Sequence, residues 1–88
     1  MKNIKDLFKN EVIKKILLFF NENPYSIDTA KGISIWVGCD VDAVQKALDR
    51  LAKEQVLVSH ETAFTKAYSY TNQRGITRKI EKYIENSI

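Results

Sequence analysis

The chain has 88 residues, of which 44 % are hydrophobic and 28 % charged, and its formal net charge is +3 at pH 7. This length suits one domain, residues 1–88. The longest apolar run, residues 16–20, excludes a membrane-spanning helix, which needs about 20 apolar residues. The start of the chain is charged and leads into no signal-type apolar stretch, so we expect a cytoplasmic protein.

Cysteine and histidine are too scarce for most metal or catalytic chemistry. The chain holds one cysteine, Cys39, and one histidine, His60. A single thiol cannot form an internal disulfide, and zinc sites built on thiolates need several. The sequence contains no phosphate-binding glycine loop and no pairing of a nucleophile with a base. We therefore expect no enzyme, no metal and no cofactor, and no small-molecule ligand is evident.

The positive charge is concentrated at the two ends of the sequence. Residues 1–20 contain five lysines against two acidic residues, and residues 74–88 contain four basic against two acidic residues. Residues 40–54 contain three basic and four acidic residues. The middle of the chain is therefore slightly acidic, which is unfavourable for contact with phosphates.

Apolar residues recur at three- and four-residue steps from Ile4 onward, which predicts a helix over residues 4–21. Pro24 disfavours helical geometry in the residue before it and ends this helix. Residues 25–27 are expected to be extended.

Asp28 is the expected N-cap of a second helix over residues 29–37, because its carboxylate can accept from exposed backbone N–H groups. Gly38 ends that helix, since glycine adopts the left-handed conformation without penalty. Gly32, inside it, indicates a close approach of another helix.

Asp40 is the next expected N-cap, and it begins a third helix over residues 41–54. Residues 56–71 are expected to form a β-hairpin, with both tyrosines of its second strand on one face. Thr71 can cap a last helix over residues 73–87. The predicted fold is mainly α with a small β-hairpin (α+β), in the order helix, short strand, helix, helix, strand, strand, helix.

Three stretches carry a family resemblance. The turn Gly38-Cys39-Asp40 separates two helices that a hairpin follows directly, as in a helix-turn-helix with a wing. Val44, Leu48, Leu51 and Leu57-Val58 match a V-x-x-x-L-x-x-L … L-V pattern, and Tyr68-Ser69-Tyr70-Thr71 with Gly75 matches Y-x-L-T-x-x-x-G except that Tyr70 replaces the leucine. The chain resembles the winged helix-turn-helix domains of small prokaryotic transcription regulators, such as the MarR-like, ArsR-like and PadR-like groups.

The resemblance implies that the helix over residues 41–54 lies in the major groove of DNA and that the hairpin touches the backbone or minor groove. Its outward residues by position are Asp42, Ala43, Gln45, Lys46, Asp49 and Arg50. Gln45 can pair with adenine, Lys46 or Arg50 with guanine or phosphate, and Asp42 with cytosine. Asp49 would oppose phosphates.

The alternative is that these residues form solvated pairs one helical turn apart, such as Asp42 with Lys46 and Asp49 with Lys53. Lys31 near the start of the second helix and Lys66 near the hairpin tip are placed to meet phosphates, although a lone surface lysine often serves only solubility.

Several remaining residues have a structural and a functional interpretation. Phe64, at the hairpin tip, can insert into a groove or a partner, but packing against the domain is the expected outcome. Trp36, Phe19, Phe20 and Cys39 are expected in the core. His60 is expected to be a structural or surface residue. Asp40 and Asp42 have no third ligand nearby, which favours capping over metal binding.

The last helix carries an apolar stripe of Ile76, Ile80, Tyr83 and Ile84. In the family such terminal helices often build a homodimer, and we expect one here. The alternative is that the stripe covers the chain's own first helix.

The sequence thus favours a DNA-binding transcription regulator whose partner is double-stranded DNA. The acidic third helix and the aromatic hairpin tip support an alternative, a winged helix used as a protein–protein interaction module without DNA binding.

Overall fold

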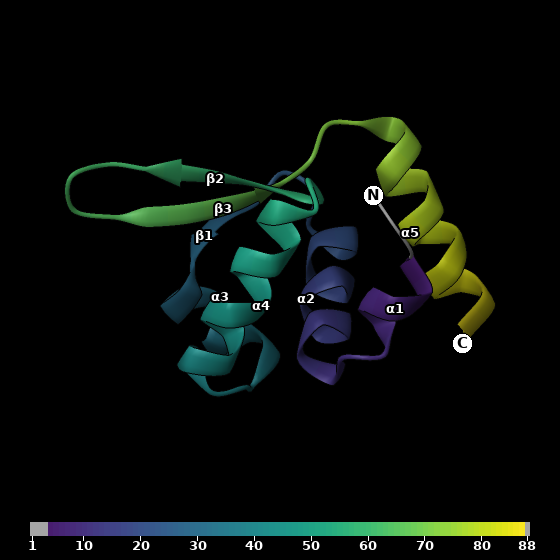
Figure 1. Ribbon diagram of the computed structural model, residues 1–88, viewed down its shortest axis with the longest axis horizontal. Helices are drawn as coiled ribbons and strands as arrows, with labels where there is room; N and C mark the ends of the chain where they lie inside the picture. The colour runs from purple at the N-terminus through teal and green to yellow at the C-terminus, as the bar shows by residue number, and fades with distance from the viewer. Residues whose placement is uncertain (1–3, 88) are drawn as a thin grey trace.

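The computed structural model describes residues 4–87, which form an α+β fold of five helices and one antiparallel sheet. In chain order the elements are α1 (Ile4–Phe8), α2 (Glu11–Glu22), β1 (Ile27–Thr29), α3 (Ala30–Val37), α4 (Val41–Lys53), β2 (Leu57–Glu61), β3 (Lys66–Tyr70) and α5 (Arg74–Ser87). The hairpin of β2 and β3 projects from one side of the helices, and α5 lies at the other end (Figure 1). Residues 1–3 and 88 of the expected domain lie outside the described residues. No helix within residues 4–87 is long and apolar enough to cross a membrane.

The single helix expected over residues 4–21 is wrong, because the chain forms two helices there. The backbone N–H groups of Lys9 and Asn10 bond to the carbonyl oxygens of Asp6 and Leu7, which closes α1. The Asn10 side chain then accepts from the N–H of Ile13 at 3.0 Å and caps α2. Asparagine favours such caps over helix interiors, and its side chain overrides the continuous apolar periodicity.

The start of α3 also differs from the prediction, since its N-cap is Thr29 and not Asp28. The Thr29 hydroxyl accepts from the N–H of Gly32 at 3.1 Å. Asp28 instead belongs to β1, and its carboxylate accepts from the N–H of Thr29 at 2.8 Å. A Cβ on Gly32 would collide with the Asp28 side chain. The glycine therefore makes room for this carboxylate, and not for another helix.

The turn between α3 and α4 confirms two capping predictions. Gly38 has φ +69°, the left-handed conformation, and its N–H bonds to Ser34. The Asp40 carboxylate accepts from the N–H groups of Asp42 and Ala43 at 3.1 and 3.2 Å. These two residues end one helix and begin the next within a three-residue connection.

Two residues after the end of α4 the chain passes through an unfavourable backbone conformation. Gln55 has φ +64°, the one non-glycine residue with positive φ among those described. The N–H of Val56 bonds to Leu51 and that of Gln55 to Ala52, which is the Schellman pattern. Val56 and Leu51 are both buried, so the hydrophobic contact that accompanies this pattern holds a glutamine where glycine is usual.

Strand β3 is the centre of the sheet, in the order β1-β3-β2, and both pairings are antiparallel. Tyr68 lies opposite Asp28 on one side and Ser59 on the other. Tyr68 and Tyr70 face the helices and are buried, as their spacing predicts, and the Tyr70 ring stacks on Phe20 with centroids 5.9 Å apart. The sheet thus covers the helical core with its central strand.

The core joins all five helices and the sheet. Phe20 is fully buried as expected, but Phe19 and Cys39 are only partly buried against the core. The expectation for Trp36 is wrong, because its side chain is 71 % exposed. The packing expected of Phe64 is also wrong, since this residue lies beyond the reach of the helices, in the hairpin turn, and is 97 % exposed.

The apolar stripe of α5 packs within its own chain. Ile80 and Ile84 are buried, Ile76 and Tyr83 are partly buried, and the Tyr83 ring stacks on Phe8 of α1 with centroids 4.5 Å apart. Helix α5 contacts α1 and α2. The four residues expected at a homodimer interface therefore cover this chain's first two helices, which is the alternative given above. Thr71 accepts from the N–H of Gln73, which precedes α5, so this hydroxyl caps the turn and not the helix.

The two left-handed helix ends give opposite predictions. Replacing Gly38→Ala puts a Cβ at a left-handed position with free space around it and should lower the free energy of unfolding by about 1 kcal/mol. The substitution Gln55→Gly relieves the strain of a side chain at a left-handed position and should raise the free energy of unfolding by a similar amount. Urea denaturation measures both, and a loss of stability in Gln55→Gly would contradict the account of the α4 end.

Candidate nucleic-acid interface

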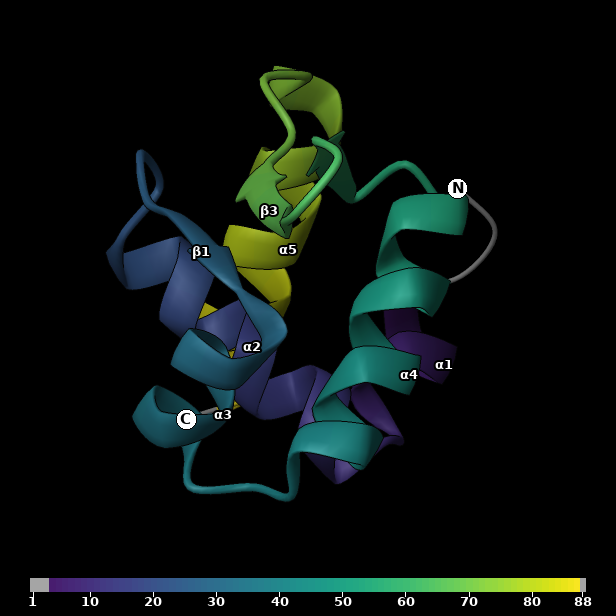
Figure 2. The same ribbon diagram turned by 90° about the vertical axis from the view of Figure 1, so that its left-hand side faces the viewer.

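One face of α4 points away from the core and carries three of the residues expected to contact DNA. Asp42, Lys46 and Arg50 follow one another at single helical turns and are all exposed. Lys53 continues this face in the last turn, although it was not among the residues predicted for DNA contact. Figure 2 shows α4 running along one side of the molecule, with α3 across the turn from its start.

The solvated pairs of the alternative interpretation do not form among the described residues. Among the described residues Lys46 makes no ion pair with Asp42, and Lys53 makes none with Asp49. The side chains of Lys46 and Arg50 have no hydrogen-bond or ion-pair partner within residues 4–87. Two cations one turn apart are therefore free to meet an anionic ligand.

Two further predicted positions on the helices differ in exposure. Lys31 is exposed near the start of α3, as predicted for a phosphate contact. Ala43 is only partly exposed, in the first turn of α4 beside the Asp40 cap.

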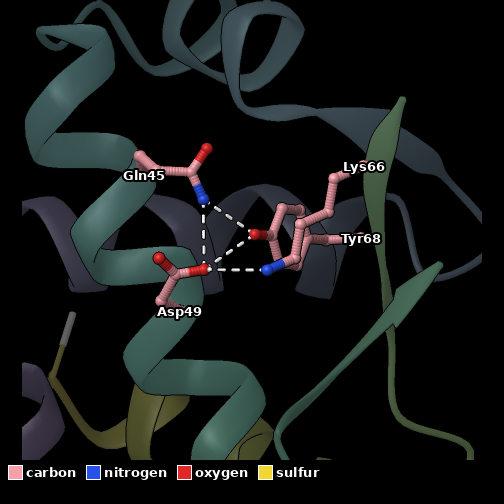
Figure 3. A network of polar contacts seen from close by, with 4 residues as sticks. All are labelled: Gln45, Asp49, Lys66 and Tyr68. Atoms are coloured by element: carbon pink, nitrogen blue, oxygen red, sulfur yellow. Dashed lines mark hydrogen bonds and ion pairs between the residues drawn. The ribbon is translucent and has the colours of Figure 1, made fainter. Parts of the chain in front are cut away.

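Gln45, Asp49, Lys66 and Tyr68 form a polar network between α4 and β3, which we call the α4–β3 network (Figure 3). The Tyr68 hydroxyl donates to Oδ1 of Asp49 at 2.8 Å. Nε2 of Gln45 donates to the Tyr68 hydroxyl at 2.7 Å and to the same Asp49 oxygen at 3.1 Å. Nζ of Lys66 lies 3.6 Å from that oxygen. One carboxylate oxygen thus anchors a glutamine, a tyrosine and a lysine.

Protonation in this network follows from its geometry. Burial raises the pKa of the Tyr68 phenol, and the hydrogen bond that it donates to Asp49 raises it further. The neighbouring Tyr68 phenol, negatively charged once it ionises, raises the pKa of Lys66, and the Asp49 carboxylate adds to this effect. Tyr68 therefore stays a neutral donor and Lys66 a cation at neutral pH.

The network changes the roles expected of three residues. The amide nitrogen of Gln45 is used inside the network while its oxygen points away from the network (Figure 3), whereas pairing with adenine needs both groups. Lys66 is the first residue of β3 and pairs with Asp49, so it does not lie free at the hairpin tip. Asp49, expected to oppose phosphates, uses one carboxylate oxygen for internal partners, while its side chain stays 53 % exposed.

The sequence predicts the two residue pairs of this network but not the contact between them. Gln45 and Asp49 are one helical turn apart, and Lys66 and Tyr68 are two residues apart on one strand face. Each pair could be recognised from its spacing alone. That the two pairs face each other depends on how the hairpin crosses α4, which no local pattern encodes.

The outer face of the hairpin carries one further polar contact. Nε2 of His60 lies 2.7 Å from the hydroxyl of Ser69 across the β2–β3 pair, and both residues are solvent-accessible. His60 is thus a surface residue of the sheet. Within the described part of the chain, no three His, Cys, Asp or Glu side chains are grouped so that they could hold a metal ion.

Comparison of the chain with protein-family models finds no matching family, and comparisons with curated proteins and with solved structures find no match either. Function is therefore inferred from the residues of this chain.

Two tyrosine hydroxyls, two positions apart in β3, give different predictions. Tyr68→Phe removes the hydroxyl that joins Gln45 to Asp49 and should lower the free energy of unfolding by about 1 kcal/mol. The buried hydroxyl of Tyr70 has no hydrogen-bond partner among the described residues, so Tyr70→Phe should leave stability unchanged or raise it. Chemical denaturation of both variants measures the difference, and equal losses would show that the α4–β3 network does not contribute to stability.

Proposed function

We propose that the protein is a winged helix-turn-helix transcription regulator of the cytoplasm that binds duplex DNA through α4 and the β2–β3 hairpin. The observation that supports this most directly is the pair Lys46 and Arg50, two exposed cations without internal partners on the outer face of α4. Lysine and arginine contacts to phosphates supply most of the affinity of such proteins for DNA. Lys31 and Lys53 extend the cationic surface to α3 and to the end of α4.

The arrangement of elements supports the same proposal. Helices α3 and α4 are joined by a three-residue turn, and the hairpin that follows contacts α4 through the network. In a helix-turn-helix protein the second helix lies in the major groove, and its first residues approach the bases. Here those residues are Asp42 and Ala43, with Gln45 offering an acceptor oxygen. An adenine N6 or cytosine N4 amino group is the base atom that such acceptors would take.

The acidic residues of α4 oppose DNA binding less than their number indicates. Asp40 is used as an N-cap, and Asp49 is used in the α4–β3 network. Asp42 is the acidic side chain that remains beside Lys46 on the outer face. The positive charge of the outer face is therefore greater than the sum over residues 40–54 indicates.

Lys46→Ala and Arg50→Ala should each weaken binding to a random-sequence duplex, because each removes one cation from the phosphate-facing surface. The loss should be on the order of tenfold at about 50 mM salt and should shrink at about 200 mM salt, with a salt dependence lower by about one released ion per variant. Fluorescence anisotropy of a labelled duplex measures it.

Lys79→Ala is the matched control for these variants, since Lys79 is an exposed lysine of α5 outside the proposed surface. It should bind DNA as the wild-type protein does. Unchanged affinity in both α4 variants would remove α4 as the DNA-contacting helix.

Asp49→Asn tests the effect of the network on the same surface. The variant keeps an oxygen that can accept from Tyr68 but loses the charge that holds Lys66. Affinity for duplex DNA should rise, and it should rise more than in Asp42→Asn, which removes one charge from α4 without releasing Lys66. Equal affinities of the two variants in the same anisotropy titration would show that Lys66 does not reach the DNA.

A second candidate function is supported by Phe64. Phe64 lies in the hairpin turn and is 97 % exposed. An aromatic side chain this exposed is typical of a surface that binds a partner, and it suits a winged helix that docks on another protein. If the wild-type protein leaves the random duplex unbound even at low salt, this function replaces the first. Phe64→Ala should then release a partner protein that the wild-type chain retains on an affinity column.

A further inference from the structure

Helices α2 and α3 pack side by side and leave an apolar groove on the surface between them. Its volume is about 300 Å³. Six side chains define what we call the α2–α3 patch: Lys15, Leu18, Phe19 and Glu22 from α2, and Trp36 and Val37 from α3. None of them belongs to the surface proposed for DNA binding, so the inference below does not rest on that function.

The centre of the α2–α3 patch is apolar and open to solvent. Trp36 is 71 % exposed, and its ring lies on Phe19 with centroids 5.9 Å apart. Leu18, Phe19 and Val37 are partly buried beneath it. A tryptophan costs free energy when it stands in water, and contiguous exposed apolar side chains mark surfaces that bind another molecule.

The charges at the edge of the patch indicate which molecule covers it. Lys15, Leu18, Phe19 and Glu22 have the spacing of one helix face, with the lysine at one end and the glutamate two turns later. Both charged residues are exposed, and neither has an ion-pair partner within residues 4–87. They are equally distant from the midpoint between Leu18 and Phe19.

This spacing makes the patch complementary to itself. If two α2 helices pack antiparallel about a two-fold axis between Leu18 and Phe19, Lys15 of each copy lies opposite Glu22 of the other. A two-fold interface uses the same surface on both subunits, so two equivalent ion pairs flank an apolar centre. We propose that the α2–α3 patch is the interface of a homodimer, and that the partner seated on it is a second copy of this chain.

The proposal moves the dimer interface away from α5, whose apolar stripe is occupied by α1 and α2 of its own chain. Dimerisation through this patch can also be followed by the fluorescence of a residue within it. Trp36 is the one tryptophan in the sequence, so tryptophan fluorescence reports on the patch alone. Dimerisation transfers its indole ring from water to an apolar contact, and its emission should shift to shorter wavelength as protein concentration rises.

Charge reversal tests the pairing itself. Lys15→Glu and Glu22→Lys each create two repulsive contacts in a homodimer, so each variant alone should dimerise about tenfold more weakly in sedimentation equilibrium at low salt. An equimolar mixture of the two variants should recover wild-type association, because each repulsive contact becomes attractive in the mixed dimer. The double variant Lys15→Glu/Glu22→Lys should recover it as well.

Circular dichroism melting shows whether each variant is folded, and Lys79→Glu, a charge reversal on α5, is the control that should leave dimerisation unchanged. The proposal is overturned if the wild-type chain stays monomeric at all concentrations, or if it dimerises with no shift in Trp36 emission. It is also overturned if Lys79→Glu weakens the dimer as much as Lys15→Glu does, or if the mixture associates no better than its components.

Discussion

The hydroxyl group of Tyr68 joins the two halves of this fold. Its strand, β3, is hydrogen-bonded to β1 and β2, so the whole sheet moves with it. Its ring is buried among the helices, and its hydroxyl meets Asp49 and Gln45 of α4. A hydrogen bond from a buried donor to a charged acceptor is stronger than a neutral one. The orientation of the hairpin relative to α4 is therefore set by this contact.

Asp49 has a second effect, which is on charge. A carboxylate on the exposed side of a helix would ordinarily act against an anionic ligand, but here one of its oxygens accepts from two neutral donors and lies beside Lys66. The stability of the contact between α4 and β3 and the charge of the outer face of α4 are thus linked through one side chain. A change at this position alters both, whereas changes at Lys46 or Arg50 alter the surface charge alone.

Local rules predicted the parts of the fold that local chemistry controls. Gly38 and Asp40 could be placed from the sequence because a left-handed glycine and a capping carboxylate act within a few residues. Asn10 was missed because the apolar spacing around it continues without interruption, and only its capping bond separates α1 from α2. Thr29 was missed because Asp28, beside it, is an equally good cap by type, and both residues lie in β1, so residue type and position do not separate them.

The candidate site was less predictable than the fold, for a physical reason. The exposed face of α4 follows from helical spacing, so Asp42, Lys46 and Arg50 could be identified. The α4–β3 network depends on a hairpin crossing a helix, and no periodicity records that crossing. Trp36 was expected in the core because of its size and its apolar neighbours. Its position depends on whether anything packs over α3, and within residues 4–87 nothing covers it.

The stacking of Phe8 on Tyr83 has a consequence for how the chain folds and comes apart. These rings lie 4.5 Å apart although nearly the whole sequence separates them. A contact between such distant positions closes a loop of most of the chain, and it gains little until the intervening segments are in place. Helices α1 and α5, which contact each other and α2, therefore meet along a seam whose formation depends on the intervening fold. Truncation from either end opens that same seam and bares the apolar side of α2, so the two ends of the protein are equivalent in what their loss exposes.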